Sequence, residues 1–149
     1  MNKRLLPLLV LVLLAGIGSG CRSFEKDWAA AAATPFNPAN PLSGRWIGTW
    51  QNTNNSHSGP LRAVIQPADP DTRFARFHAS WGSHSGSFTS RLKVTAGTPP
   101  SAFTSRKYIL GFLIKTRGQA TATEFNANYE SVFDSGTFTL RRADPPAAH

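Results

Sequence analysis

The sequence predicts an all-β fold, a small antiparallel barrel of eight strands that run up and down in turn. Three observations indicate it. Short segments of alternating apolar and polar residues recur between residues 44 and 142. Clusters of Gly, Pro, Asn, Asp and Ser separate these segments. No stretch in this region shows the helical apolar period. The links are too short for crossovers, which favours a closed barrel over the alternative, a β-sandwich.

The strands are predicted from this alternation. In the first strand Trp46 and Trp50 share one face, and in the last strand Phe138 and Leu140 do the same. A half-buried antiparallel sheet explains such patterns. The predicted strands are Gly44–Gln51, Leu61–Gln66, Arg73–Trp81, Gly86–Thr95, Ala102–Ile109, Phe112–Thr121, Glu124–Ser131 and Gly136–Arg142.

The interior of such a barrel is just wide enough for side chains or for one small ligand. If the protein carries a small apolar ligand, the small inward residues would bound its cavity. A filled interior would instead indicate a structural protein. The small residues are Gly48, Ala63, Ala75, Ser90 and Ala127.

The chain before the barrel has the features of an exported lipoprotein. Two basic residues precede the apolar run Leu5–Ile17, and the small residues Gly18–Gly20 follow. This order is typical of a secretory signal peptide. The segment that ends at Cys21 resembles a bacterial lipobox. The resemblance implies that residues 1–20 are a lipoprotein signal peptide and that Cys21 is acylated and attached to membrane lipid.

Two alternatives remain for this segment, an uncleaved anchor helix and ordinary cleavage that leaves Cys21 as a spare thiol. The apolar run is shorter than the ~20 residues that span a bilayer. Cys21 is the only cysteine, so it forms no internal disulfide. Arg22 stands where an aspartate would signal retention at the inner membrane. By resemblance the protein is therefore expected at the outer membrane, facing the periplasm.

Four segments follow from these patterns. After the signal peptide, residues 21–43 are predicted to hold the acylated cysteine and a disordered tether rich in proline and alanine. Trp28 and the alanines after it are compatible with a short helical turn, and the prolines at 35, 38 and 41 favour extended chain afterwards. Residues 44–142 form the barrel domain, and residues 143–149 are predicted to be a disordered tail.

The composition is strongly basic. The net charge is +8, and it falls to +6 when Lys3 and Arg4 leave with the signal peptide. A basic surface indicates anionic partners, either lipid headgroups or anionic envelope polymers. The export signal argues against nucleic acid. Nine basic residues would form one stripe if they share an outer face, and otherwise they are simply solvated: Arg62, Arg73, Arg76, Arg91, Lys93, Arg106, Lys107, Lys115 and Arg117.

The first strand carries a family resemblance. The segment from Gly44 to Trp50 resembles the opening strand of calycin-type barrels, the lipocalins and fatty-acid-binding proteins, which begin with Gly-x-Trp. The whole barrel resembles small bacterial exported proteins that open with Gly-x-Trp-x-Gly-x-Trp. These proteins close with Tyr-x-Ser-x-x-Asp-x-Gly-x-Phe-x-Leu, here Tyr129 to Leu140. The resemblance implies a Trp plug at one barrel end, with Trp46 and Trp50 as candidates for a plug or for ligand contact. It implies no activity.

One rim of the barrel gathers the remaining candidate residues. The first, third, fifth and seventh links of an up-and-down barrel share a rim, so His57, His84 and Asp134 are expected together. Two histidines and a carboxylate can bind zinc or iron, which is the alternative of a metal-dependent enzyme. As hairpin residues they are simply solvated. No nucleophile motif or phosphate loop occurs.

We therefore predict a membrane-anchored envelope lipoprotein without enzymatic activity or a cofactor. Its barrel is a binding or structural module. Carriage of a small apolar ligand is the first alternative, and a metal-dependent enzyme is the second.

Overall fold

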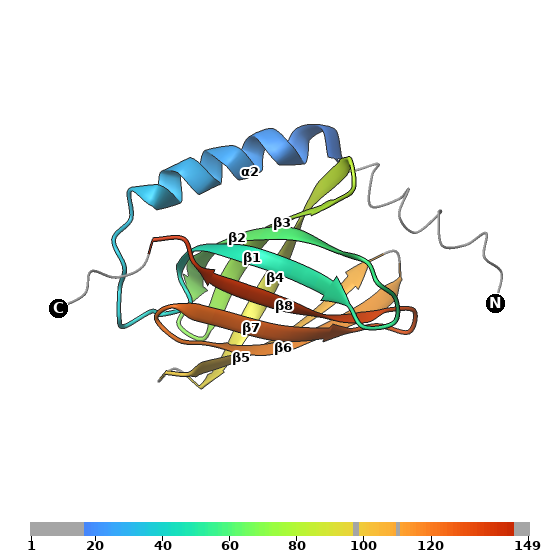
Figure 1. Ribbon diagram of the computed structural model, residues 1–149. Helices are drawn as coiled ribbons and strands as arrows, with labels where there is room; N and C mark the ends of the chain where they lie inside the picture. Colours follow the sequence, from blue (N-terminus) through green and yellow to red (C-terminus); the bar gives the residue numbers. More distant parts are fainter. Residues whose placement is uncertain (1–16, 97–98, 110, 145–149) are drawn as a thin grey trace.

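The computed structural model describes residues 17–96, 99–109 and 111–144 and confirms the closed barrel. Eight antiparallel strands pair in chain order, and β8 pairs with β1 (Figure 1). One helix, α2 (Ile17–Ala32), lies outside the barrel. The strands are β1 (Gly44–Asn52), β2 (Ser58–Asp69), β3 (Thr72–Trp81), β4 (His84–Ala96), β5 (Ser101–Ile109), β6 (Phe112–Ala120), β7 (Glu124–Glu130) and β8 (Ser135–Arg142).

Strand β2 is longer than predicted. The alternation indicated Leu61–Gln66, but the strand includes Pro60 and Pro67 as well. Proline has no N–H to donate to the ladder, so both residues resemble turn signals in the sequence. Pro60 nevertheless pairs in register with β1 and Pro67 with β3, where a register shift follows it. The ends of the other strands differ from the predicted bounds by at most two residues, and many coincide with them.

Aromatic and aliphatic side chains pack together in the barrel interior. Phe103 stacks on Phe125 with ring centroids 4.9 Å apart, and Phe77 stacks on Phe88 at 5.0 Å. At Gly118 a Cβ atom would come within 2.7 Å of Cζ of Phe103, so this glycine lets the ring lie against the barrel wall. The main hydrophobic core is Leu42, Trp46, Leu61, Ala63, Ile65, Ala75, Phe77, Leu92, Phe103, Ala120, Phe125, Ala127 and Leu140.

Trp46 plugs the end of the barrel where β1 begins. Its side chain is 0% exposed, and its indole N–H donates to the carbonyl oxygen of Leu42 at 2.9 Å. The guanidinium carbon of Arg142 lies 4.2 Å from the ring centroid of Trp46. The same guanidinium donates to the carbonyl oxygens of Ser43, at 2.7 Å, and Pro41. Burial lowers the pKa of Arg142 to about 10. These contacts hold the preceding segment over the barrel end.

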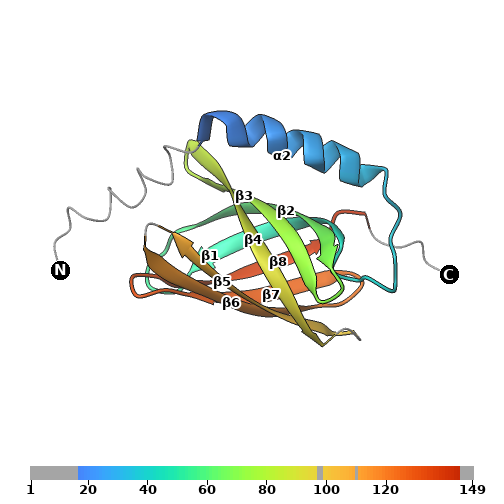
Figure 2. The same ribbon diagram turned by 180° about the vertical axis from the view of Figure 1, so that it is seen from behind.

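The segment before the barrel differs from the extended tether that we predicted. Helix α2 packs on the outside of β1–β4 (Figure 2). Phe24 is fully buried there, and its ring centroid lies 5.1 Å from that of His78 and 5.9 Å from that of Trp28. The cause lies in local sequence. Phe24, Trp28 and Ala31 recur at helical spacing on one face, and the alanines around them favour helix.

The first two residues of the predicted disordered tail, Ala143 and Asp144, are held against the barrel. The backbone N–H of Ala143 donates to the carbonyl oxygen of Arg45 at 2.9 Å. Asp144 accepts hydrogen bonds from the Arg45 guanidinium, one of them at 2.6 Å. Residues 145–149 of this tail and residues 1–16 of the predicted signal peptide lie outside the described residues. In the described ranges no helix has the length and apolar character needed to cross a membrane.

Candidate functional site

The strand order brings the predicted histidine rim to one end of the barrel. It places His57 and Asp134, in two links, and His84, the first residue of β4, at the same end of the barrel. Asp134 accepts hydrogen bonds from the side-chain amide of Asn52 and from the Tyr129 hydroxyl, the latter at 3.5 Å. Burial, and secondarily Asp134, raise the pKa of Tyr129. In the described part of the chain no group of three His, Cys, Asp or Glu side chains is placed to hold a metal ion.

Trp50, the second candidate for a plug or for ligand contact, makes an internal hydrogen bond. Its indole N–H donates to the carbonyl oxygen of Ser80 at 3.0 Å, so the group ties β1 to β3 across β2. The Trp46 indole N–H donates to the carbonyl oxygen of Leu42. Both tryptophans therefore have structural roles in the fold.

The nine basic residues do not share one outer face. Arg73 and Lys107 lie on the inward side of their strands. The Arg73 guanidinium donates to the side chain of Asn40 at 2.6 Å, and the Lys107 ammonium donates to the carbonyl oxygen of Thr89. Burial lowers the pKa of Lys107. The other seven face outward but fall on different sides of the barrel.

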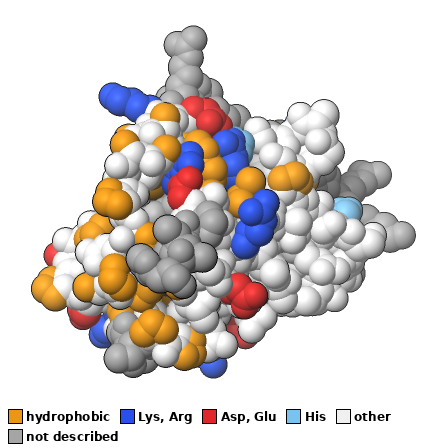
Figure 3. Space-filling model, turned by 60° about the vertical axis from the view of Figure 1, so that its left-hand side comes forward, with side chains coloured by type: hydrophobic (Ala, Val, Ile, Leu, Met, Phe, Trp, Pro, Cys, Tyr) orange, Lys and Arg blue, Asp and Glu red, His pale blue; other side chains and the backbone are white. Residues whose placement is uncertain are grey.

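Helix α2 neutralises the basic side chains over β2 and β3. The guanidinium carbon of Arg62 lies 5.0 Å from the ring centroid of Phe24, and Arg62 also pairs with Glu25. Arg76 pairs with Asp27 at 2.8 Å. Figure 3 shows acidic and basic side chains beside one another in the upper part of that view. The hydrogen bond from Arg62 lowers the pKa of Glu25. The charges of Arg62 and Arg76 are therefore compensated by carboxylates of the same chain.

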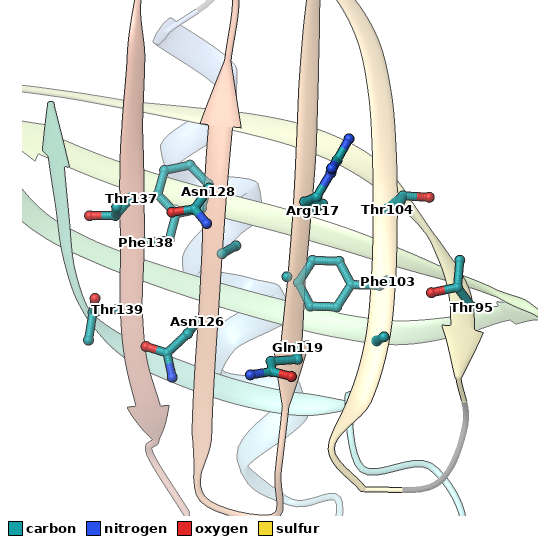
Figure 4. A pocket seen from close by; sticks show the side chains of 13 residues that line it. Thr95, Phe103, Thr104, Arg117, Gln119, Asn126, Asn128, Thr137, Phe138 and Thr139 are labelled. Atoms are coloured by element: carbon teal, nitrogen blue, oxygen red, sulfur yellow. The ribbon is translucent and has the colours of Figure 1, made fainter. Parts of the chain in front are cut away.

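A shallow, open groove with polar side chains along it lies on the opposite side of the barrel. It has a volume of about 480 Å³ and runs over β5 to β8 (Figure 4). Two cross-strand rows of outward side chains line it. Side chains directly opposite one another on neighbouring strands are ~5 Å apart, so each row is continuous. The rows are Thr104, Arg117, Asn128 and Thr137, and Ala102, Gln119, Asn126 and Thr139.

The polar groups of this groove are available for a ligand. Within the described residues, the side chains of Arg117, Asn126 and Asn128 have no hydrogen-bond or ion-pair partner. All three are exposed. Lys93 extends the first row beyond Thr104, which places a second cation two strands, or ~10 Å, from Arg117. The groove thus combines amides and hydroxyls with positive charge.

Comparison with known proteins adds no family assignment. The chain matches no family model, and no curated protein matches it. The candidate site therefore depends on the geometry of the groove.

The sequence contained part of the signal for this groove. Arg117 is among the predicted basic residues, and Asn126 and Asn128 alternate in the sequence with the apolar residues of their strand. An outward face built from amides and hydroxyls, with few Lys and Glu residues, is the feature that sets it apart. Its assembly depends on the register of four strands, which the sequence does not show.

Proposed function

We propose that the protein is an envelope lipoprotein, anchored through acylated Cys21, whose groove on β5–β8 binds a hydroxyl-rich anionic polymer. Arg117 carries this proposal because its guanidinium is unpaired and stands in a row with Asn128 and Thr104. Guanidinium groups bind carboxylate, sulfate or phosphate in a bidentate manner. Neighbouring amides and hydroxyls both donate to and accept from sugar hydroxyls. An acidic envelope glycan offers both chemistries.

The N-terminal sequence supports the anchor. The basic start, the apolar run and the small residues before Cys21 are those of an exported lipoprotein. Arg22 supports transfer to the outer membrane, where the barrel would face the periplasm. The helix–barrel contacts described above, from Phe24 to Trp28, all follow Cys21, so cleavage before Cys21 leaves them in place.

The packed core supports binding on the outside of the barrel. The small inward residues Ala63, Ala75 and Ala127 are buried in the core. The large rings beside them contact one another, for example Phe77 and Phe138 at 5.7 Å. Carriage of an apolar ligand would require these rings to separate.

Mass spectrometry of the protein extracted from its own envelope tests the anchor. The expected mass begins at Cys21 and includes acyl chains. The variant Cys21→Ser is expected to lack this acyl mass. A mature mass that begins at Met1, or at Cys21 without acyl mass, contradicts the proposal.

Binding to a labelled polygalacturonate, a carboxylated glycan, tests the groove. We expect fluorescence anisotropy to show binding that Arg117→Gln weakens about tenfold, a loss typical of a hydrogen bond to a charged group. Arg91→Gln is the matched control, because Arg91 is an exposed arginine that faces outward on β4. Equal losses of affinity in the two variants would mean that binding depends on net charge alone. Absence of binding by the unmodified protein would overturn this choice of ligand.

A further inference from the structure

Exposed apolar side chains gather at one end of the barrel. Four large hydrophobic residues are exposed in the described part of the chain, Tyr108 by 68%, Phe112 by 37%, Val132 by 78% and Phe133 by 54%. All four lie in the β5–β6 and β7–β8 hairpins, at the rim that carries the first, third, fifth and seventh links. We call these four residues the aromatic rim.

The aromatic rim is a preformed surface. The rings of Phe112 and Phe133 meet edge to face, with centroids 4.6 Å apart, and so join the two hairpins. Exposed apolar residues that cluster in this way mark a contact with a partner or a membrane. The interior packing of the barrel does not explain them, because they lie beyond the buried core.

Basic side chains stand directly behind the aromatic rim. Arg106 and Lys115 are opposite one another on the outward faces of β5 and β6, one outward position back from Tyr108. Glu130 lies 3.8 Å from Lys115, and Arg106 has no ion-pair partner among the described residues. Aromatic residues at the tip with Lys and Arg behind them match the order of a membrane interface, where rings enter the headgroup region and cations meet lipid phosphates.

Helix α2 brings the proposed anchor to the same end. Along the helix, Trp28 lies over Arg45, near the start of β1, whereas Phe24 lies over His78, near the rim end of β3. The helix backbone at Cys21 is three residues further toward the rim, ~4.5 Å at 1.5 Å per residue. Figures 1 and 2 both show the start of α2 above the tip of the β3–β4 hairpin.

We propose that the aromatic rim docks into the headgroup region of the phospholipid bilayer that holds acylated Cys21. This inference rests on the proposed lipid anchor and adds a second contact that fixes the orientation of the barrel. The barrel then stands on the membrane with this rim, and the groove on β5–β8 faces sideways into the surrounding space. An acyl anchor alone would leave the barrel free to rotate.

Site-specific fluorescence in vesicles tests this orientation. The acylated full protein is reconstituted into vesicles of phosphatidylethanolamine and phosphatidylglycerol that contain a spin-labelled lipid. An environment-sensitive thiol label is attached at Val132→Cys, since acylation blocks the thiol of Cys21. Thr123→Cys, an exposed position in the β6–β7 link at the opposite end, is the matched control. We expect the label at residue 132 to be quenched several-fold more than the label at residue 123.

Second-site variants identify the groups responsible. In the Val132→Cys background, Tyr108→Ser with Phe133→Ser is expected to reduce quenching to the control level while the protein still floats with the vesicles. Arg106→Gln with Lys115→Gln is expected to reduce quenching in the anionic vesicles but not in vesicles of phosphatidylcholine alone. Urea unfolding of each variant confirms that these exposed substitutions leave the barrel folded.

The outcomes separate this inference from the proposed function. If the protein floats with the vesicles but the two labels are quenched equally, or residue 123 more strongly, the rim does not dock and the anchor stands. If the serine variant is quenched as fully as its parent, the aromatic rim is not the contact. If the acylated protein fails to float, the anchor fails and the rim inference falls with it.

Discussion

The two sides of the barrel differ in the partners of their outward polar side chains. On β1–β4 the outward arginines lie under helix α2, where aromatic rings and carboxylates satisfy them. On β5–β8 the outward amides and Arg117 have no partner in the described part of the chain. One side therefore uses its charge to hold a helix, and the other side leaves its polar groups free for a ligand. A count of basic residues does not distinguish these two uses.

The two sides are also stabilised from opposite directions. The covered side receives Phe24 and Trp28 from outside the barrel. The bare side is supported from within, where the Phe103 ring lies against Gly118 and stacks on Phe125. The difference teaches that a barrel wall needs a packing partner on only one face, so a wall with a filled interior can leave its outer face for binding.

Removing Phe24 should have the largest effect. Phe24→Ala deletes the ring that fills the space between α2, Arg62 and His78, and we expect a loss of ~3 kcal/mol in the free energy of unfolding. Urea titration measures this loss, and faster tryptic cleavage at Lys26 reports the undocked helix. Lys26→Ala, at an exposed position on the same helix, is the stability control. An unchanged midpoint for Phe24→Ala would mean that α2 adds nothing to the stability of the covered side.

Adding a methyl group at Gly118 should break the internal support of the bare side. Its Cβ would lie 2.4 Å from the carbonyl oxygen of Asn126 and 2.7 Å from the Phe103 ring, so the wall or the ring must shift. We expect Gly118→Ala to cost ~2 kcal/mol in urea unfolding, as overpacking does. Gln119→Ala, at the next and exposed position, should change stability little. Equal stabilities would show that the Phe103 ring has room to move.

The sequence predicted the architecture better than the surfaces. Alternation at Trp46, Phe138 and Leu140 fixes which face points inward, and short links fix the strand order. The alanines after Trp28 indicate only a short helical turn, and the prolines after Ala33 favour an extended tether. The longer helix depends on the burial of Phe24 and Trp28 against the barrel, a tertiary contact that the sequence does not show. The groove could not be predicted, because Arg117 and Asn128 become neighbours only through the register of the strands.

Paired substitutions of two arginines sharpen the comparison. Arg62→Gln removes the contacts with Phe24 and Glu25, and we expect ~1 kcal/mol less stability, a value limited by the solvent exposure of Glu25. Arg117→Gln removes the same charge from the bare side, where Arg117 has no hydrogen bond or ion pair with the described residues, and should leave the unfolding midpoint unchanged. Parallel urea titrations measure both. A larger loss for Arg117→Gln would reverse the roles that we assign to the two sides.

Acid should weaken the covered side first, with the smallest effect of the series. Burial, and then the charge of Arg62, lower the pKa of His78 below 6.5, while Glu25 opposes this shift. The other groups around the ring are Phe24 and Ser87, whose Oγ lies 2.8 Å from Nδ1.

Undocking the helix exposes His78 and so moves its pKa back toward the ordinary value, although Arg62 on β2 stays beside it. Docking is therefore strongest above pH 6.5, weakens as the pH falls toward the lowered pKa, and then levels off. Glu25 adds a second loss, which begins below its ordinary pKa of 4.5 because its pKa is lowered in the docked state. Urea unfolding at a series of pH values across this range measures both steps. His78→Phe keeps a ring against Phe24 and should remove the upper step alone; a persistent upper step would assign it to another group.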